Sequence, residues 1–159
     1  MGSEIERKFL VRGELPIADV AGSLQLQGYL AISERGTVRM RIEKGRAILG
    51  IKSAQKGLTR LEYEYEVPMA EGEEMLAELC GLVVEKTRYK LEHAGHTWDV
   101  DVFHGVNDGL VTAEVELESE EEEVQLPPWV GDDVSHDVRY RVAYLSQHAW
   151  PEWGTKPAE

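Results

Sequence analysis

The run Glu4-Ile5-Glu6-Arg7-Lys8 opens the chain with charged side chains at every second position. In an extended strand, successive side chains point to opposite faces, so Glu4, Glu6 and Lys8 lie in one row with Cα atoms about 6 to 7 Å apart. Two carboxylates in such a row suit a hard divalent cation. The neighbouring ammonium suits a phosphate or, with a lowered pKa, a proton transfer. The alternative interpretation of these five residues is a solvated strand face.

The same alternation returns in seven later segments of the chain, most clearly in residues 37–44, where Arg39 and Arg41 alternate with apolar neighbours. After residues 4–11, the predicted strands span 24–33, 37–44, 47–53, 60–67, 83–92, 97–103 and 110–118. Apolar side chains recur at helical spacing in residues 70–79 and 137–150, which predicts two helices. This order favours a mainly β (α+β) fold with an antiparallel sheet closed, or nearly closed, into a barrel.

One face of these predicted strands carries charged side chains almost throughout. They are Glu4, Glu6, Lys8, Arg39, Arg41, Lys52, Glu62, Glu64, Lys86, Arg88, Asp99, Asp101, Glu114 and Glu116. An ordinary antiparallel sheet has such a face in contact with water. If the strands instead close around the charges, the interior is a polar tunnel, and helices or a partner subunit must cover the apolar face. Both arrangements have the same alternation, so periodicity leaves the two open.

Length, net charge and cysteine content limit the number of domains, the kinds of partner and the cellular compartment. A chain of 159 residues is long enough for one domain with a real core, which we place at residues 1–150, followed by a flexible tail at 151–159. The net charge of -13 argues against nucleic-acid or anionic-membrane surfaces as partners. The single cysteine, Cys80, and the absence of a long apolar segment favour a cytoplasmic protein.

The opening run is similar to the E-x-E-x-K signature of the CYTH superfamily, the triphosphate tunnel metalloenzymes. Further segments resemble the family's pattern in the same order, up to about residue 145. They are Gln27-Gly28-Tyr29-Leu30, Arg39 with Arg41, Lys52, Glu62 to Glu64, Glu85 to Arg88, Asp99 with Asp101, Glu114 with Glu116, and Asp137 to Tyr140. Each pattern is weak alone, but their shared order is specific. The short chain most resembles the compact bacterial members that hydrolyse inorganic triphosphate.

The resemblance implies an eight-stranded antiparallel barrel around a tunnel, in which basic side chains bind a triphosphate and acidic ones hold Mg²⁺ or Mn²⁺. The implied substrate-binding residues are Lys8, Arg39, Arg41, Lys52, Lys86, Arg88 and Arg139, with Arg141 as a second candidate for the late basic position. The implied metal ligands are Glu4, Glu6, Glu114, Glu116 and Asp101, supported by Glu62, Glu64 and Asp99. Forked arginine donors suit phosphate oxygens, and carboxylates suit hard cations, which agrees with this division.

Several alternatives stay open at this point. Lys8, hydrogen-bonded to Tyr29, acts as a general base on the attacking water if neighbouring cations destabilise its ammonium, and otherwise only holds phosphate. The leading function is hydrolysis of inorganic triphosphate. The second is thiamine triphosphate or nucleoside triphosphate hydrolysis, or ATP cyclisation. The third is a polyphosphate-binding module without turnover. A homodimer is expected if the barrel exposes apolar side chains.

Overall fold

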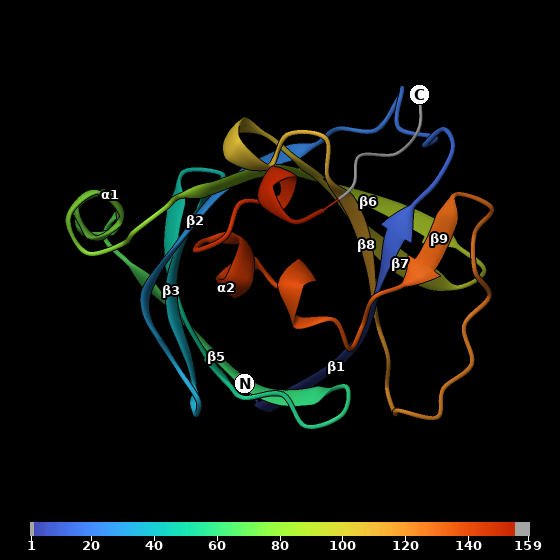
Figure 1. The fold of residues 1–159 in the computed structure, drawn as a ribbon, viewed down its shortest axis with the longest axis horizontal. Coiled ribbons are helices and arrows are strands. Elements are labelled where there is room, and N and C mark those ends of the chain that lie inside the picture. Colours follow the sequence, from blue (N-terminus) through green and yellow to red (C-terminus); the bar gives the residue numbers. More distant parts are fainter. Residues whose placement is uncertain (1, 155–159) are drawn as a thin grey trace.

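The computed structural model describes residues 2–154, in which strands form most of the regular structure (Figure 1). Within this range the strands are β1 (Gly2–Val11), β2 (Ser23–Ser33), β3 (Gly36–Glu43), β4 (Arg46–Ser53), β5 (Thr59–Val67), β6 (Val84–His93), β7 (His96–Phe103), β8 (Val111–Glu116) and β9 (Val130–Asp133). The helices are α1 (Met69–Glu78) and the four-residue α2 (Val142–Leu145), with 3-10 turns η1 (Gly105–Asn107), η2 (Val138–Tyr140) and η3 (Trp150–Glu152). No helix in this range is long and apolar enough to cross a membrane.

The strands close into a ring because β1 pairs with two neighbours. The sheet runs β5-β4-β3-β2-β6-β7-β8-β1, and β1 also pairs with β5. The first half of β1 lies along β5, where Glu4 faces Arg60, and its second half lies along β8, where Lys8 faces Glu114. All the pairings are antiparallel. The predicted eight-stranded antiparallel barrel is therefore confirmed.

The ninth strand, β9, was not predicted. It pairs with the end of β1, where Phe9 faces Asp133 and Val11 faces Val130. Its sequence is Val-Gly-Asp-Asp, which has neither the β-branched content nor the alternation of the other strands. The pairing partner, rather than local preference, makes these residues a strand.

Two clusters of apolar side chains lie outside the ring, under covering segments, which decides the question that periodicity left open. One cluster packs Phe9, Trp98 and Val100 against Trp129 and against Val130, the first residue of β9. A second joins Met40 and Ala47 to Leu76 of α1. A Cβ on Gly72 would collide with the Ala47 side chain, so glycine is what lets α1 approach β4 this closely. A third cluster, with Val84 and Phe103, lies on the same strand faces as Lys86 and Asp101 and packs against α2. The charged faces of the strands are left to line the interior.

The C-terminal segment lies across the opening of the ring in Figure 1. The single helix predicted for residues 137–150 is wrong: the segment is broken into η2, α2 and η3. Arg141 is extended (φ -75°, ψ 141°) between the first two pieces, and the backbone N–H of Trp150 donates to Asn107 Oδ1 (2.8 Å) instead of continuing a helix. Packing against the barrel thus overrides the apolar periodicity.

The flexible tail predicted for residues 151–159 falls partly outside the described residues. Up to residue 154, the Trp153 ring packs edge-on against Tyr140 and Tyr144. Its indole N–H donates to the carbonyl of His148 (2.9 Å). Residues 155–159 lie beyond the part of the chain that the structure describes.

Candidate active site

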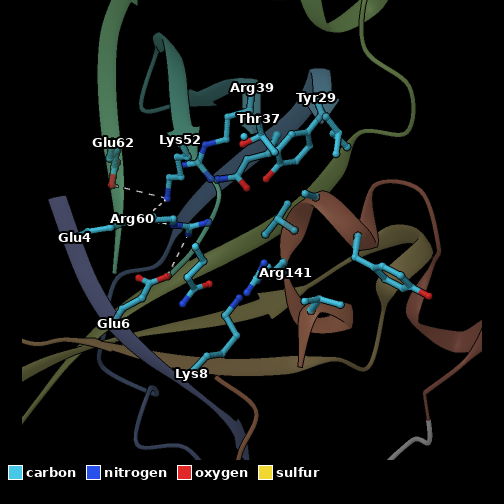
Figure 2. A pocket seen from close by; sticks show the side chains of 18 of the residues that line it. Glu4, Glu6, Lys8, Tyr29, Thr37, Arg39, Lys52, Arg60, Glu62 and Arg141 are labelled. Atoms are coloured by element: carbon cyan, nitrogen blue, oxygen red, sulfur yellow. Dashed lines mark hydrogen bonds and ion pairs between the residues drawn. The ribbon is translucent and has the colours of Figure 1, made fainter. Parts of the chain in front are cut away.

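The barrel encloses a cavity of about 530 Å³ whose wall is dominated by charged side chains (Figure 2). The basic lining residues are Lys8, Arg39, Arg41, Lys52, Arg60, Lys86, Arg88 and Arg141. The acidic ones are Glu4, Glu6, Glu34, Glu62, Glu64, Asp99, Glu114, Glu116 and Asp137. Charges removed from water are costly unless they are paired, and here acids and bases from neighbouring strands are interleaved. This is the polar interior that the alternating strands predicted as one of two arrangements.

Glu4 is the centre of the pairing between β1, β4 and β5. Lys52 Nζ and Arg60 Nε each donate to Glu4 Oε1 over 2.8 Å, and Lys52 Nζ lies 3.8 Å from Glu62 Oε2 (Figure 2). Burial alone would raise the pKa of Glu4, but a hydrogen bond to Glu62 and the charges of Lys52 and Arg60 lower it to about 2. Burial and the same hydrogen bond to Glu4 raise the pKa of Glu62 to about 7. Of the two carboxyls, Glu62 is therefore the one that holds a proton more readily, and Glu4 is the one that stays ionised.

A second acidic group lies where β1 meets β8. Glu6 faces Glu116 across the pairing, and Lys8 faces Glu114, with Lys8 Nζ 3.2 Å from Glu114 Oε1. Burial, the Glu114 carboxylate and the Glu4 carboxylate raise the pKa of Glu6 to about 8. The raised pKa reports electrostatic crowding of carboxylates that a divalent cation would relieve.

The carboxylate oxygens on β1 and β8 are of the type that Mg²⁺ and Mn²⁺ prefer, so the residues present fit such an ion. Within residues 2–154, however, no group of three or more His, Cys, Asp or Glu side chains is already arranged to hold a metal. Instead, Arg60 and Lys52 both contact one oxygen of Glu4, Oε1. To hold a metal ion, Glu4 would have to give up these contacts, and its side chain would have to move.

Arg39 and Arg41 project from β3 toward the cavity. Arg39 is 8% exposed and, among the described residues, has no carboxylate within ion-pair distance. Gly50 faces it on β4, where a Cβ would approach Arg39 Cγ and Nε to 3.4 Å, so glycine leaves room for the guanidinium. Arg41 contacts Glu64 through Nη2 (3.1 Å). The fork of Arg39 is thus available to an anion without displacing a carboxylate.

Asp101 anchors the basic side chains of β6. Its two oxygens accept from Lys86 Nζ, Arg88 Nε and Arg88 Nη2, each over 2.8 Å. Burial favours the neutral acid, but the charges of Lys86 and Arg88 prevail and lower the pKa of Asp101. Burial in turn lowers the pKa of Lys86 to about 8. Asp101 is 1% exposed and does not line the cavity. The structure therefore places it behind the basic residues, and not among the candidate metal ligands as the sequence predicted.

Comparisons with known proteins agree with this geometry. The family model described as "CYTH domain" matches residues 2–144. The chain belongs to the CYTH family. It is 44% identical over 141 residues to an inorganic triphosphatase of Acetivibrio thermocellus, covering 88% of this chain and 90% of that protein. It is 36% identical over 144 residues to an inorganic triphosphatase of Nitrosomonas europaea, covering 87% and 93%. A crystal structure of an inorganic triphosphatase superposes with a TM-score of 0.69 at 33% identity, covering 92% of this chain and 95% of that one.

The resemblance to the CYTH family read from the sequence is confirmed, and most of its residues meet in the cavity. The carboxylates predicted to support the metal ligands lie beside bases: Glu62 near Lys52, Glu64 near Arg41, and Asp99 near Arg88 (3.6 Å).

The basic residue that the C-terminal segment contributes to the cavity is Arg141, and not Arg139, which the sequence favoured. Arg139 does not line the CYTH cavity; its guanidinium pairs with Asp137 and lies over the Trp153 ring, 5.0 Å from the centroid. Arg141 lines the cavity in its place (Figure 2). Its Nε is buried without a hydrogen-bond partner, and burial together with the nearby Arg60 charge lowers its pKa. The extended backbone at Arg141, which the predicted helix did not anticipate, turns this side chain inward.

Lys8 and Tyr29 lie apart. Tyr29 faces Arg39 across the β2–β3 pairing and lies beside it in Figure 2. Lys8 Nζ donates to the Tyr140 carbonyl oxygen (2.9 Å), and within the described residues no hydrogen bond joins Lys8 to Tyr29. The expected bond between them is therefore absent from the structure.

Arg60 is the residue that motif reasoning missed. It lines the cavity and contacts Glu4 and Glu6, although it belongs to none of the quoted motifs. The signal was present in the strand alternation, because Arg60 precedes Glu62 and Glu64 at two-residue intervals and so shares their face.

Proposed function

We propose that this CYTH protein hydrolyses inorganic triphosphate to pyrophosphate and phosphate with the help of Mg²⁺ or Mn²⁺. The observation that supports this best is the enclosed cavity in which unpaired or loosely paired guanidinium groups face a set of carboxylates. The relatives named inorganic triphosphatase, which cover most of the chain, support the same reaction. A binding module without turnover would gain little from carboxylates that repel its anionic ligand.

The basic side chains hold the substrate in this proposal. Arg39, Arg41 and Arg88 offer forked donors to phosphate oxygens, while Lys52 and Lys86 act as compact charges. Arg141 replaces Arg139 in the set, since its Nε is buried without a partner and an anion there would offset the repulsion from the Arg60 charge. Asp101, Asp99 and Glu64 keep these bases in place before substrate arrives. Positioning and charge stabilisation are what phosphoryl transfer mainly needs from a protein.

The carboxylates of Glu4, Glu6, Glu114 and Glu116 would hold the metal. A bound divalent cation supplies charge neutralisation on the phosphates and eases loss of a proton from water. Burial and the neighbouring carboxylates raise the pKa of Glu6 to about 8, which favours its protonated form in the free protein. Metal binding, which needs the ionised carboxylate, would therefore release a proton from Glu6.

We assign Lys8 to phosphate binding and positioning rather than to general-base catalysis. Its ammonium lies between Glu114 and the Tyr140 carbonyl oxygen, two acceptors that hold its hydrogens. The oxygen of a water molecule then attacks the terminal phosphorus, the bond from that phosphorus to the bridging oxygen breaks, and pyrophosphate leaves. The proton lost by the water goes to solvent or to a cavity carboxylate.

Product analysis tests the reaction. Phosphorus NMR of tripolyphosphate incubated with the protein and Mg²⁺ should show equal amounts of phosphate and pyrophosphate, with no further breakdown of pyrophosphate. No conversion, or cleavage of ATP or thiamine triphosphate alone, would replace this proposal with one of the alternatives. The cytoplasmic location and the homodimer stay predictions from the sequence.

A further inference from the structure

Two buried polar atoms without partners lie on residues that face each other in the barrel wall. Gln27 on β2 and Arg41 on β3 are register partners, which puts their Cβ atoms about 4.5 to 5.5 Å apart. Gln27 Oε1 and Arg41 Nε are each buried with no hydrogen-bond partner within the described chain. One is an acceptor and the other a donor. Buried polar groups are normally satisfied, so two complementary orphans on neighbouring residues indicate a contact made in another state of the site.

A chain of hydrogen bonds fixes the direction of the Gln27 side chain. Glu43 Oε2 accepts from Ser23 Oγ (2.8 Å) and from Gln25 Nε2 (2.9 Å). Gln25 therefore presents its Oε1, which accepts from Gln27 Nε2 (3.2 Å). Because a carboxylate only accepts, neither amide can be reversed without losing its bond. Burial would favour the neutral acid, but the bonds from Gln25 and Ser23 lower the pKa of Glu43 and keep it an acceptor. The orphaned Gln27 Oε1 is thus a fixed feature of the wall.

Arg41 has other partners in the free protein. Its Nη2 lies 3.1 Å from Glu64 Oε2, and its Nε lies 3.7 Å from Glu43 Oε1, too far for a hydrogen bond. A phosphate that binds the terminal nitrogens of Arg41 competes with the Glu64 carboxylate for Nη2. The two anions also repel each other. The guanidinium must then shift, and Nε needs an acceptor that does not neutralise the arginine.

We propose that Gln27 is a positioning residue for Arg41. When a triphosphate engages the guanidinium, Arg41 Nε–H donates to Gln27 Oε1, which steadies the fork toward the substrate. Because the amide is neutral, the positive charge of Arg41 stays available to the phosphate. A carboxylate in the same place would partly neutralise it. This inference rests on the proposed function for the identity of the ligand, but it concerns binding and not the chemical step.

A double-mutant cycle on tripolyphosphate binding tests the proposal. Calorimetric titration of the full chain in EDTA separates binding from turnover. Gln27→Met, which keeps the volume and removes the acceptor, should weaken binding roughly tenfold in the wild-type background. In an Arg41→Ala background the same change should have little further effect, because the lost bond no longer exists. Gln125→Met, an exposed substitution in the loop before β9, should bind like the wild type.

A second variant guards against misfolding. Gln25→Met breaks the hydrogen-bond chain but leaves Gln27 present, so it should cause a smaller loss of binding that also disappears with Arg41→Ala. Wild-type binding by Gln27→Met, or a loss that stays the same without Arg41, would overturn the inference. A wild type that binds tripolyphosphate but does not hydrolyse it with Mg²⁺ would overturn the proposed function and leave this inference standing. A wild type that fails to bind tripolyphosphate in EDTA would overturn this inference, while the proposed function would still be decided by product analysis with Mg²⁺.

Discussion

Arg60 on β5 faces Glu4 on β1, and its Nε donates to Glu4 Oε1 over 2.8 Å. Its Nη2 lies 3.4 Å from Glu6 Oε1. One guanidinium therefore bridges two of the carboxylates proposed to hold the metal, and serves as their counter-charge in the free protein. Burial disfavours the charged form of Arg60, but Glu6 and Glu4 prevail and raise its pKa.

Removing this bridge should destabilise the free protein. Arg60→Met removes the cation that contacts both Glu4 and Glu6 and leaves only Lys52, among the described residues, at Glu4, and should lower the free energy of unfolding by about 2 to 4 kcal/mol in EDTA. Added Mg²⁺ should recover part of the loss by supplying positive charge. Arg46→Met is the control, because Arg46 and Glu66 form an exposed pair whose loss costs less than about 1 kcal/mol. Urea denaturation measures both variants; an equal effect of the two substitutions would contradict the bridging role.

Stability should fall with rising pH between about 4.5 and 8. The pKa of Glu6 is raised to about 8 and that of Glu62 to about 7, against an ordinary value of 4.5. In this window the folded protein retains protons that the unfolded chain has released, so raising the pH favours unfolding. Below this window, the lowered pKa of Glu4, about 2, acts in the opposite direction.

The pH effect is measured by urea denaturation in EDTA at several pH values. Glu6→Gln should remove much of the slope, and Mg²⁺ should flatten it, because a cation stabilises the ionised carboxylates. A wild-type stability that rises from pH 5 to 8 would be inconsistent with the crowding of Glu6 by Glu114 and Glu4.

The two late arginines should differ in kinetic importance. Arg141→Ala removes a cavity-lining cation and should raise KM and lower kcat, by about 2 to 3 kcal/mol in kcat/KM. Arg139→Ala removes a half-exposed side chain that does not line the cavity and only pairs with Asp137 at its edge, and should change kcat/KM by less than about 1 kcal/mol. Steady-state kinetics on tripolyphosphate compares them. The opposite order, in variants with wild-type stability, would return the role to Arg139.

Lys8→Arg tests how the attacking water loses its proton. Arginine keeps the positive charge but does not act as a base at accessible pH. If Lys8 only holds phosphate, the variant should keep a measurable part of kcat and the same alkaline limb in its pH profile. If the alkaline limb disappears together with nearly all activity, Lys8 is the general base after all.

Much of the site followed from the period-two pattern, because strand alternation places every second side chain on one face whatever the neighbours are. That Glu4, Arg39 and Glu114 share the charged face was predictable in this way, whereas the resemblance to the CYTH family alone implied that this face lines the inside of the ring. The pattern failed where tertiary contacts decide the outcome. Asp101 shares the charged face but sits behind Lys86 and Arg88, and Arg141 turns inward only because the C-terminal segment breaks at its backbone. Local periodicity predicts neither whether a side chain reaches the cavity nor where packing interrupts a helix.

The most direct test of the central claim is the rate of phosphate release from tripolyphosphate, ATP and thiamine triphosphate, each with Mg²⁺, with Mn²⁺ and with excess EDTA. The account predicts the highest kcat/KM for tripolyphosphate, activity only with added metal, and loss of turnover in folded Glu4→Gln and Glu116→Gln. Ca²⁺ should bind but support little turnover, since it accepts looser coordination than Mg²⁺. Full activity in EDTA, or a clear preference for ATP or thiamine triphosphate, would contradict it.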